Sequence, residues 1–337
     1  MKIVLDITKL VKDGEITSDQ ADKLKKFAAK ETGSLGINIL IAFGVVAICL
    51  GIFSFNPSLV FALFLGAVLT VSGVVIKQYH NELWGPLGSA NLMIGAIVFT
   101  SAFTIFYVEQ FGLGLELYLI ETVVLLALGV IGKSGLLVTL SALSVAAWLG
   151  GSTGYMHASY MLVIREATVT IIVFAALALG ALSISKKLPA AYERIALIYA
   201  RVSLLLVNFG FWAGSLFGDT PGESWSNTTI FTSPGKFLDF DLTTLPEEAF
   251  HISDTVFSIV WALALIAVGI WGMRQDRRFV VNTAAVFGSI LFYTKFFVYF
   301  GVINSLAWMF AGIFAIGIAL GFWKYNRLAA RPSATLS

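Results

Sequence analysis

The residues of this chain most able to do chemistry are ionisable side chains inside long apolar runs. Glu121 lies near the middle of the run 113–131, and Lys295 lies near one end of the run 279–300. A charge inside a bilayer is costly unless it is paired or hydrated, so such residues mark ion, proton or substrate sites. Glu121 is therefore a candidate transport or proton site. The alternative is a structural role, as half of a buried pair or as a neutral acid bonded to a neighbouring helix.

Lys295 is the partner that depth in the membrane predicts for Glu121. At a rise of 1.5 Å per residue, Glu121 lies about 12 Å and Lys295 about 9 Å from the same membrane surface. Thr104 of the run 89–108, and Ser289 and Tyr293 of the same run as Lys295, are polar side chains that complete the candidate site. Such residues also bond between helices without lining a pathway, and that alternative stays open.

Sequence motifs for catalysis, cofactors and metals are absent. The histidines His80, His157 and His251 lie in different connections, and no pair of them has the spacing of metal ligands. The single cysteine, Cys49, excludes an intrachain disulfide and a cysteine metal cluster. A phosphate-binding glycine loop followed by lysine and serine or threonine does not occur. We therefore expect a protein that is not an enzyme and that has no cofactor and no metal.

Composition identifies the class of protein that holds these residues. Of the 337 residues, 58% are hydrophobic and 12% are charged, and the mean hydropathy is +0.87. A soluble globular chain carries about 25% charged residues. The composition therefore excludes an ordinary soluble enzyme and a disordered chain, and the net charge of +2 does not indicate nucleic-acid binding. We expect an all-α bundle of membrane-spanning helices.

Ten apolar runs are candidates for membrane spans, because a hydrocarbon core of about 30 Å needs about 20 helical residues. They cover residues 36–55, 59–76, 89–108, 113–131, 135–149, 167–184, 195–217, 254–273, 279–300 and 303–323. The fifth run is the shortest and ends in the glycine-rich segment 150–154, which we interpret as a loop. Gly44 with Gly51 and Gly66 with Gly73 provide small faces that predict close helix packing.

The distribution of lysine and arginine predicts the orientation of the spans. If the N-terminus is cytoplasmic and ten spans alternate, 18 of the 22 basic residues fall on the cytoplasmic side. This is the bias that the positive-inside rule describes, so both termini are expected in the cytoplasm. Asp6 and Lys9 interrupt the apolar run 3–11, which is not typical of a cleaved signal peptide. In a bacterium the chain would lie in the inner membrane.

Residues 1–34 form the first of three segments outside the spans and predict a small cytoplasmic helical hairpin. Gly14 suits the left-handed turn between its two helices. Thr17 and Gln20 have the spacing of a capping box at the start of the second helix. A linker at 33–34 would then join the hairpin to the membrane domain, residues 35–324.

The other two segments are the outer loop 218–253 and a cytoplasmic tail, 325–337. The loop mixes aromatic with acidic residues, and aromatic side chains favour the headgroup region of a bilayer. Packing at that interface is one interpretation of the loop, and a lid or a docking surface is the other. The expected partners are the lipid bilayer and a protein that binds the hairpin or this loop, and not nucleic acid.

A resemblance to a known family starts in the hairpin. Residues 10–20, LVKDGEITSDQ, lead into a lysine-rich helix and a glycine-rich first span. This pattern resembles the bacterial predicted membrane proteins catalogued as domain of unknown function 2157, over residues 1–150. The resemblance implies a multi-pass protein of the bacterial inner membrane, and it supplies no activity and no catalytic residues.

Two hypotheses about function follow from these patterns. Glu121 and the polar residues of the spans favour transport or permeation of a small solute through a polar cavity in the midplane of the membrane. The charged hairpin and the outer loop, with its aromatic and acidic residues, favour a non-catalytic accessory or scaffold subunit, which docks partner proteins of a membrane complex. A hydrated cavity that reaches Glu121 would distinguish the first hypothesis from the second.

Overall fold

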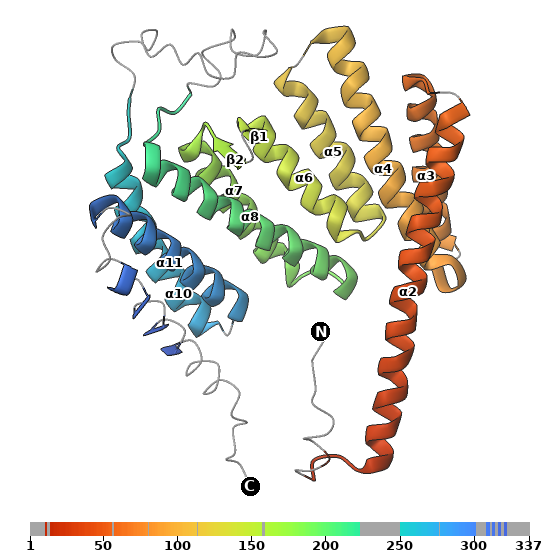
Figure 1. Cartoon of the computed structure of the whole chain (residues 1–337), viewed down its shortest axis with the longest axis horizontal. Helices are drawn as coiled ribbons and strands as arrows, with labels where there is room; N and C mark the ends of the chain where they lie inside the picture. The colour runs from red at the N-terminus through yellow and green to blue at the C-terminus, as the bar shows by residue number, and fades with distance from the viewer. Residues whose placement is uncertain are drawn as a thin grey trace. The chain divides into compact units, whose positions relative to one another are not determined.

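The structure is a computed structural model, and within the residues that it describes it consists of α-helices and a two-stranded β-hairpin (Figure 1). It describes residue 11 and residues 14–55, 57–79, 81–112, 114–156, 159–222, 250–275 and 277–300, with isolated positions between 308 and 321. Most of the tenth predicted span, the tail 325–337 and residues 223–249 of the outer loop lie outside the described residues.

Nine of the predicted spans coincide with helices. The helices are α2 (Ser18–Phe55), α3 (Leu59–Tyr79), α4 (Asn81–Phe111), α5 (Leu115–Ile131), α6 (Gly135–Trp148), α7 (Ala167–Ser185), α8 (Ala190–Phe217), α10 (Asp254–Arg274) and α11 (Arg278–Phe300). Within the described residues, six of them are long and apolar enough to cross a membrane: α3, α4, α7, α8, α10 and α11. The protein is therefore an integral membrane protein with a helical bundle. The total of ten spans stays a prediction.

Helix α2 begins at the predicted capping box. The backbone N–H of Thr17 donates to Oε1 of Gln20 at 2.9 Å, and the N–H of Gln20 donates to Oγ1 of Thr17 at 3.3 Å. Gly14 precedes the helix with φ +74°, the left-handed conformation expected of it. The linker expected at 33–34 is wrong, because α2 continues through both residues as one helix of 38 residues. The first helix of the predicted hairpin lies outside the described residues.

The chain divides into two compact units. The first unit contains Met1–Trp148 and Ala181–Tyr199, and the second contains Leu149–Gly180 and Ala200–Ser337. Helices α7 and α8 each contribute residues to both. Each unit is described below by itself.

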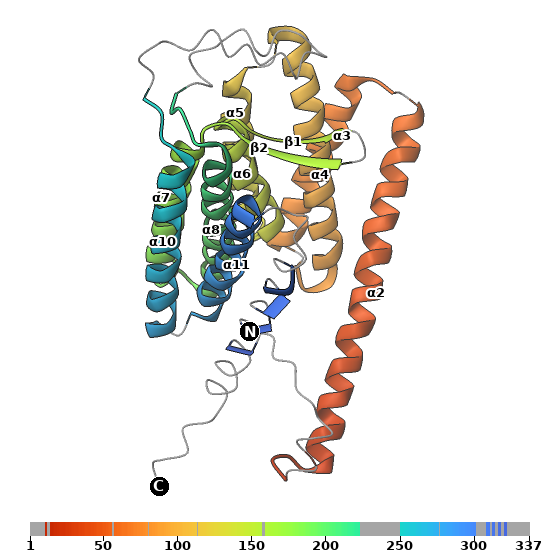
Figure 2. The same ribbon diagram turned by 60° about the vertical axis from the view of Figure 1, so that its left-hand side comes forward.

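Close packing of α3 against α4 is the central feature of the first unit (Figure 2). A Cβ atom added to Gly73 would lie 2.3 Å from the backbone nitrogen of Leu92, and one added to Gly95 would lie 2.4 Å from that of Thr70. Gly66 approaches Phe99 in the same way, so the small face predicted from Gly66 and Gly73 is confirmed.

The other predicted pair of glycines, Gly44 and Gly51 on α2, does not mark a close approach within the described residues. A Cβ added to either glycine would meet no described atom within 4 Å. Helix α2 instead packs through larger side chains, with Val45 and Cys49 buried against Ala90 of α4. Cys49 is thus a small core residue.

Helices α5 and α6 form the second packed pair of the first unit. The hydroxyl of Ser144 on α6 donates to the carbonyl of Tyr118 on α5 at 2.8 Å. A Cβ added to Gly129 on α5 would lie 2.9 Å from the backbone nitrogen of Val138 on α6. The two helices are joined by a turn in which Lys133 adopts φ +48°.

An aromatic core holds the second unit together. Phe211 of α8, Phe257 and Trp261 of α10 and Phe287 of α11 are buried in one cluster. The rings of Phe211 and Trp261 are stacked with centroids 6.3 Å apart, and Phe209 meets Phe287 edge to face at 5.5 Å. Because rings bury large apolar areas in specific arrangements, this cluster fixes how α8, α10 and α11 pack.

The segment predicted as a loop after α6 is a β-hairpin. Strands β1 (Gly151–Met156) and β2 (Ser159–Ile164) pair in antiparallel register, with Gly151 opposite Ile164 and Met156 opposite Ser159. The interpretation of 150–154 as a loop is therefore wrong for most of that segment. Glycine content favoured a loop, but a paired strand tolerates glycine when the partner strand supplies the hydrogen bonds.

Candidate functional site

The structure brings two of the predicted site residues together on neighbouring helices of the first unit. Thr104 of α4 and Glu121 of α5 form a hydrogen bond between the threonine hydroxyl and Oε1 of the carboxyl group. The same hydroxyl lies 2.8 Å from the carbonyl oxygen of Thr100, one turn earlier on α4. Both side chains are partly buried.

A second hydroxyl–carboxylate contact lies near the same helix pair. The hydroxyl of Tyr107 donates to Oε1 of Glu116 at 3.2 Å, at an exposed position. Glu116 and Glu121 are five residues apart on α5, and both carboxyl groups reach α4. The polar side of α4 thus meets two acids of α5, the deeper of which is Glu121.

The hydrogen bond between Thr104 and Glu121 can form in two arrangements. A threonine hydroxyl carries one hydrogen, so it cannot donate to the Thr100 carbonyl and to Glu121 at the same time. If Glu121 is ionised, its carboxylate accepts from Thr104. If Glu121 is neutral, its own O–H donates to Thr104, whose hydroxyl then donates to Thr100. The contact therefore persists with or without a proton on Glu121.

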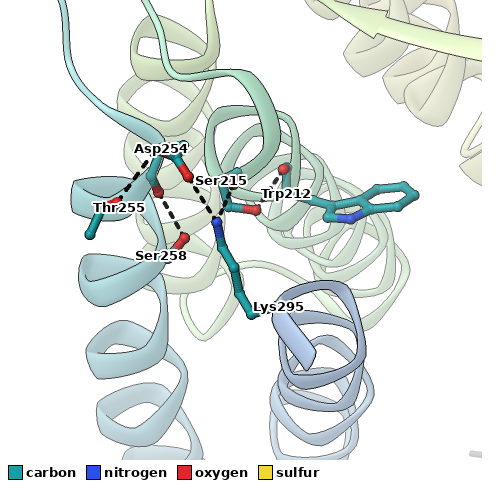
Figure 3. Close-up of polar contacts among 6 residues, drawn as sticks. All are labelled: Trp212, Ser215, Asp254, Thr255, Ser258 and Lys295. Atoms are coloured by element: carbon teal, nitrogen blue, oxygen red, sulfur yellow. Dashed lines mark hydrogen bonds and ion pairs between the residues drawn. The ribbon is translucent and has the colours of Figure 1, made fainter. Parts of the chain in front are cut away.

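Lys295 has a different partner from the one that depth predicted (Figure 3). Its ammonium donates to the carbonyl oxygen of Ser215 at 2.7 Å and forms an ion pair with Oδ2 of Asp254 at 3.1 Å. Its side chain is 20% exposed, and that of Asp254 is 47% exposed. Lys295 belongs to the second unit and Glu121 to the first, and each has a partner within its own unit. Their pairing with one another stays a prediction.

Ser289 and Tyr293, the remaining candidates, lie on α11 with Lys295. The hydroxyl of Ser289 donates to the carbonyl of Ala285 in its own helix at 2.9 Å. The ring of Tyr293 stacks on that of Phe297, with centroids 6.2 Å apart. These contacts support the alternative in which polar side chains of the spans serve helix structure and packing.

The ends of the loop 218–253 are anchored to the start of α7, which sequence reasoning missed. The carboxylate of Asp219 accepts from the backbone N–H groups of Ala167 at 3.3 Å and Thr168 at 2.7 Å, and so caps α7. Asp219 also exchanges two backbone hydrogen bonds with Ile252 at the other end of the loop, at 3.0 and 2.8 Å. The fully buried Glu166 accepts from the N–H of Gly222 at 2.8 Å.

An acid next to a loop gives little indication in sequence of such a role, because its partners are 51 or more residues away. Asp254 is likewise visible in the sequence only as the first residue of a predicted span.

Within the residues that the structure describes, no group of three or more His, Cys, Asp or Glu side chains could hold a metal ion. Comparison of the chain with family models, with curated proteins and with solved structures found no match.

Proposed function

We propose that this integral membrane protein transports a small solute and that Glu121 is the group through which transport is coupled to protons. The contact between Thr104 and Glu121 carries the proposal. A carboxyl group inside an apolar span is costly to keep, and intramembrane acids serve proton relays in pumps and transporters. The two arrangements described above give Glu121 a hydrogen-bonded form in both protonation states. A group that must gain and lose a proton during a transport cycle needs such a pair of forms.

The proposal is tested by proton movement into liposomes that contain the purified protein. A pH-sensitive dye inside the liposomes reports acidification when the external pH is lowered, in the presence of a panel of amino acids, sugars and carboxylates. We expect at least one solute to increase proton entry above that of protein-free liposomes. Glu121→Gln should abolish the increase.

Glu116→Gln is the matched control, because Glu116 lies on the same helix and also accepts from a hydroxyl of α4. It should retain the increase in proton entry. Equal proton entry with wild-type protein, Glu121→Gln protein and protein-free liposomes would overturn the proposal.

A second function, that of an accessory or scaffold subunit, is favoured by a separate observation. Asp219 and Glu166 hold both ends of the loop 218–253 against α7. The anchored ends fix where the chain leaves and rejoins the second unit on either side of residues 223–249, which a partner protein could bind. Purification of the native complex tests this function, because a stoichiometric partner lost on deletion of residues 223–249 would support a scaffold, and a chain that purifies alone would contradict it.

The proposed orientation has ten spans with both termini in the cytoplasm of a bacterium. Basic residues support it, and so does the resemblance of residues 10–20 to domain of unknown function 2157. Single cysteines placed at Asn227 and Ser337, in a protein whose Cys49 is replaced by alanine, should react with an impermeant thiol reagent from opposite sides of the membrane. Reaction from the same side would contradict the ten-span arrangement.

A further inference from the structure

A small cavity lies among α8, α10 and α11 of the second unit, away from the residues of the proposed transport site. Its volume is about 40 Å³. Most of its lining is apolar or aromatic, from Leu204, Phe211, Trp261, Leu265, Val268 and Val280. Two polar side chains also line it, Asn208 of α8 and Thr283 of α11.

Asn208 has hydrogen-bonding capacity to spare inside this cavity. It is 5% exposed. Its Oδ1 accepts from the indole N–H of Trp261 at 3.0 Å, and its Nδ2 donates to the Leu204 carbonyl at 2.8 Å. An asparagine amide has two N–H donors and two acceptor positions on oxygen. One donor and one acceptor position of Asn208 are thus available to a further group.

Thr283 faces the same cavity with an unused hydroxyl. It is 7% exposed, and its hydroxyl forms no hydrogen bond with any residue that the structure describes. Threonines of other helices, such as Thr70 of α3, Thr122 of α5 and Thr139 of α6, donate to the carbonyl four residues earlier in their own helix. The hydroxyl oxygen is not sealed off by its neighbours and is open to the cavity, so a group bound there can supply the missing hydrogen bond.

We propose that the cavity binds water, as one or two molecules that link the Thr283 hydroxyl to the Asn208 amide. A water molecule occupies about 30 Å³ in the liquid and needs two to four polar partners, and the cavity meets both conditions. Drug-sized ligands need pockets of about 300 Å³ or more, so a cavity of about 40 Å³ fits water better than a larger organic ligand. The bound water ties α8 to α11 within the bundle, beside the direct bond between Trp212 and Thr294.

The sign of a stability change tests the link to Thr283. Thr283→Val keeps the shape of the side chain and removes the hydroxyl. If water bridges Thr283 and Asn208, this substitution removes one hydrogen-bond partner of the water and lowers the Tm in detergent by about 2 °C. If the cavity is dry, it removes an unbonded hydroxyl from an apolar site and raises the Tm. Thr283→Ser, which retains the hydroxyl, should lie closer to the wild type than Thr283→Val does.

The presence of water is tested directly on the wild-type protein. Brief X-ray irradiation creates hydroxyl radicals from water, including water bound inside a protein, and mass spectrometry locates the oxidised side chains. Trp261 lines the cavity, and Phe174 on α7 is equally buried at 0% exposure. After correction for intrinsic reactivity, we expect Trp261 to be oxidised several-fold faster than Phe174. Equal slow oxidation of both, or a higher Tm for Thr283→Val, would overturn the proposal.

Discussion

The ammonium of Lys295 lies 3.1 Å from Oδ2 of Asp254, and this ion pair joins α11 to the first residue of α10. The same ammonium also donates a hydrogen bond to the carbonyl oxygen of Ser215, near the end of α8. A helix carries partial positive charge at its N-terminus and partial negative charge at its C-terminus. Asp254 lies in the first turn of α10, and the Lys295 ammonium lies at the carbonyl end of α8, so each charge is at a helix end that favours it. One cation thus ties three helices together.

Lys295→Met should destabilise the protein more than Asp254→Asn. Loss of the lysine removes both the ion pair and the bond to the Ser215 carbonyl, whereas Asp254→Asn leaves the second bond in place. We expect a decrease in Tm of a few degrees for Lys295→Met and a smaller one for Asp254→Asn, because a half-exposed ion pair is weakened by solvent. Thermal unfolding in detergent measures both.

The double substitution provides the control for coupling. In the Lys295→Met background, Asp254→Asn should change the Tm less than it does in the wild type. Equal effects in the two backgrounds would show that the ion pair contributes nothing to stability.

Gly73→Ala should strongly destabilise the bundle. A Cβ at this position would lie 2.3 Å from the backbone nitrogen of Leu92, so α3 and α4 would have to move apart. Overpacking of this kind costs about 1–3 kcal/mol, and more when backbone atoms are displaced. The fraction of folded protein after heating, followed by fluorescence-detected gel filtration, reports the change.

Gly44→Ala is the matched control, since a Cβ there meets no described atom within 4 Å. Alanine is also the better helix former, so this variant should be neutral or slightly more stable than the wild type. A Gly73→Ala variant as stable as Gly44→Ala would contradict the close approach of α3 and α4.

The helices, the capping box at Thr17 and Gln20, and the small face at Gly66 and Gly73 could be predicted from the sequence, because each depends on residues near one another in the chain. The pairing of helices could not. Depth in the membrane limits which charges can meet, but it does not say which helices are neighbours. The ion pair of Lys295 with Asp254 was therefore missed. Thr104 and Glu121 meet because their helices are consecutive in the chain.

Local signals also failed where longer-range interactions compete with them. Gly33 and Ser34 lower helix propensity by at most about 1 kcal/mol each, and the favourable residues around them allow α2 to continue. Glycines at 150–154 favoured a loop, but pairing with Ser159–Ile164 supplies the backbone hydrogen bonds of a strand. No pattern in the sequence indicates that the Thr283 hydroxyl lacks a hydrogen bond, because this depends on which side chains surround it in the fold.

Asp219→Ala should loosen the start of α7 and the base of the loop 218–253. The substitution removes the acceptor for the N–H groups of Ala167, which is buried, and Thr168, which is partly buried. Loss of a helix N-cap costs about 0.5–2 kcal/mol. Hydrogen exchange should show faster exchange of the first amides of α7 than in the wild type.

Asp219→Asn is the conservative comparison, because an asparagine side chain retains one oxygen that can cap the helix. Its exchange rates should fall between those of the wild type and Asp219→Ala. Unchanged exchange at Ala167 and Thr168 in Asp219→Ala would show that another group satisfies these amides.

Ser203→Ala should raise the stability of the second unit or leave it unchanged. Ser203 on α8 is fully buried, and its hydroxyl has no hydrogen-bond partner among the described residues. A buried hydroxyl without a partner costs about 1–3 kcal/mol, so its removal should raise the Tm by about 2 °C or more. Ser215 provides the matched control, because it is on the same helix and equally buried, but its hydroxyl donates to the Trp212 carbonyl at 2.8 Å. Ser215→Ala should therefore lower the Tm, and a decrease of equal size for Ser203→Ala would contradict the prediction.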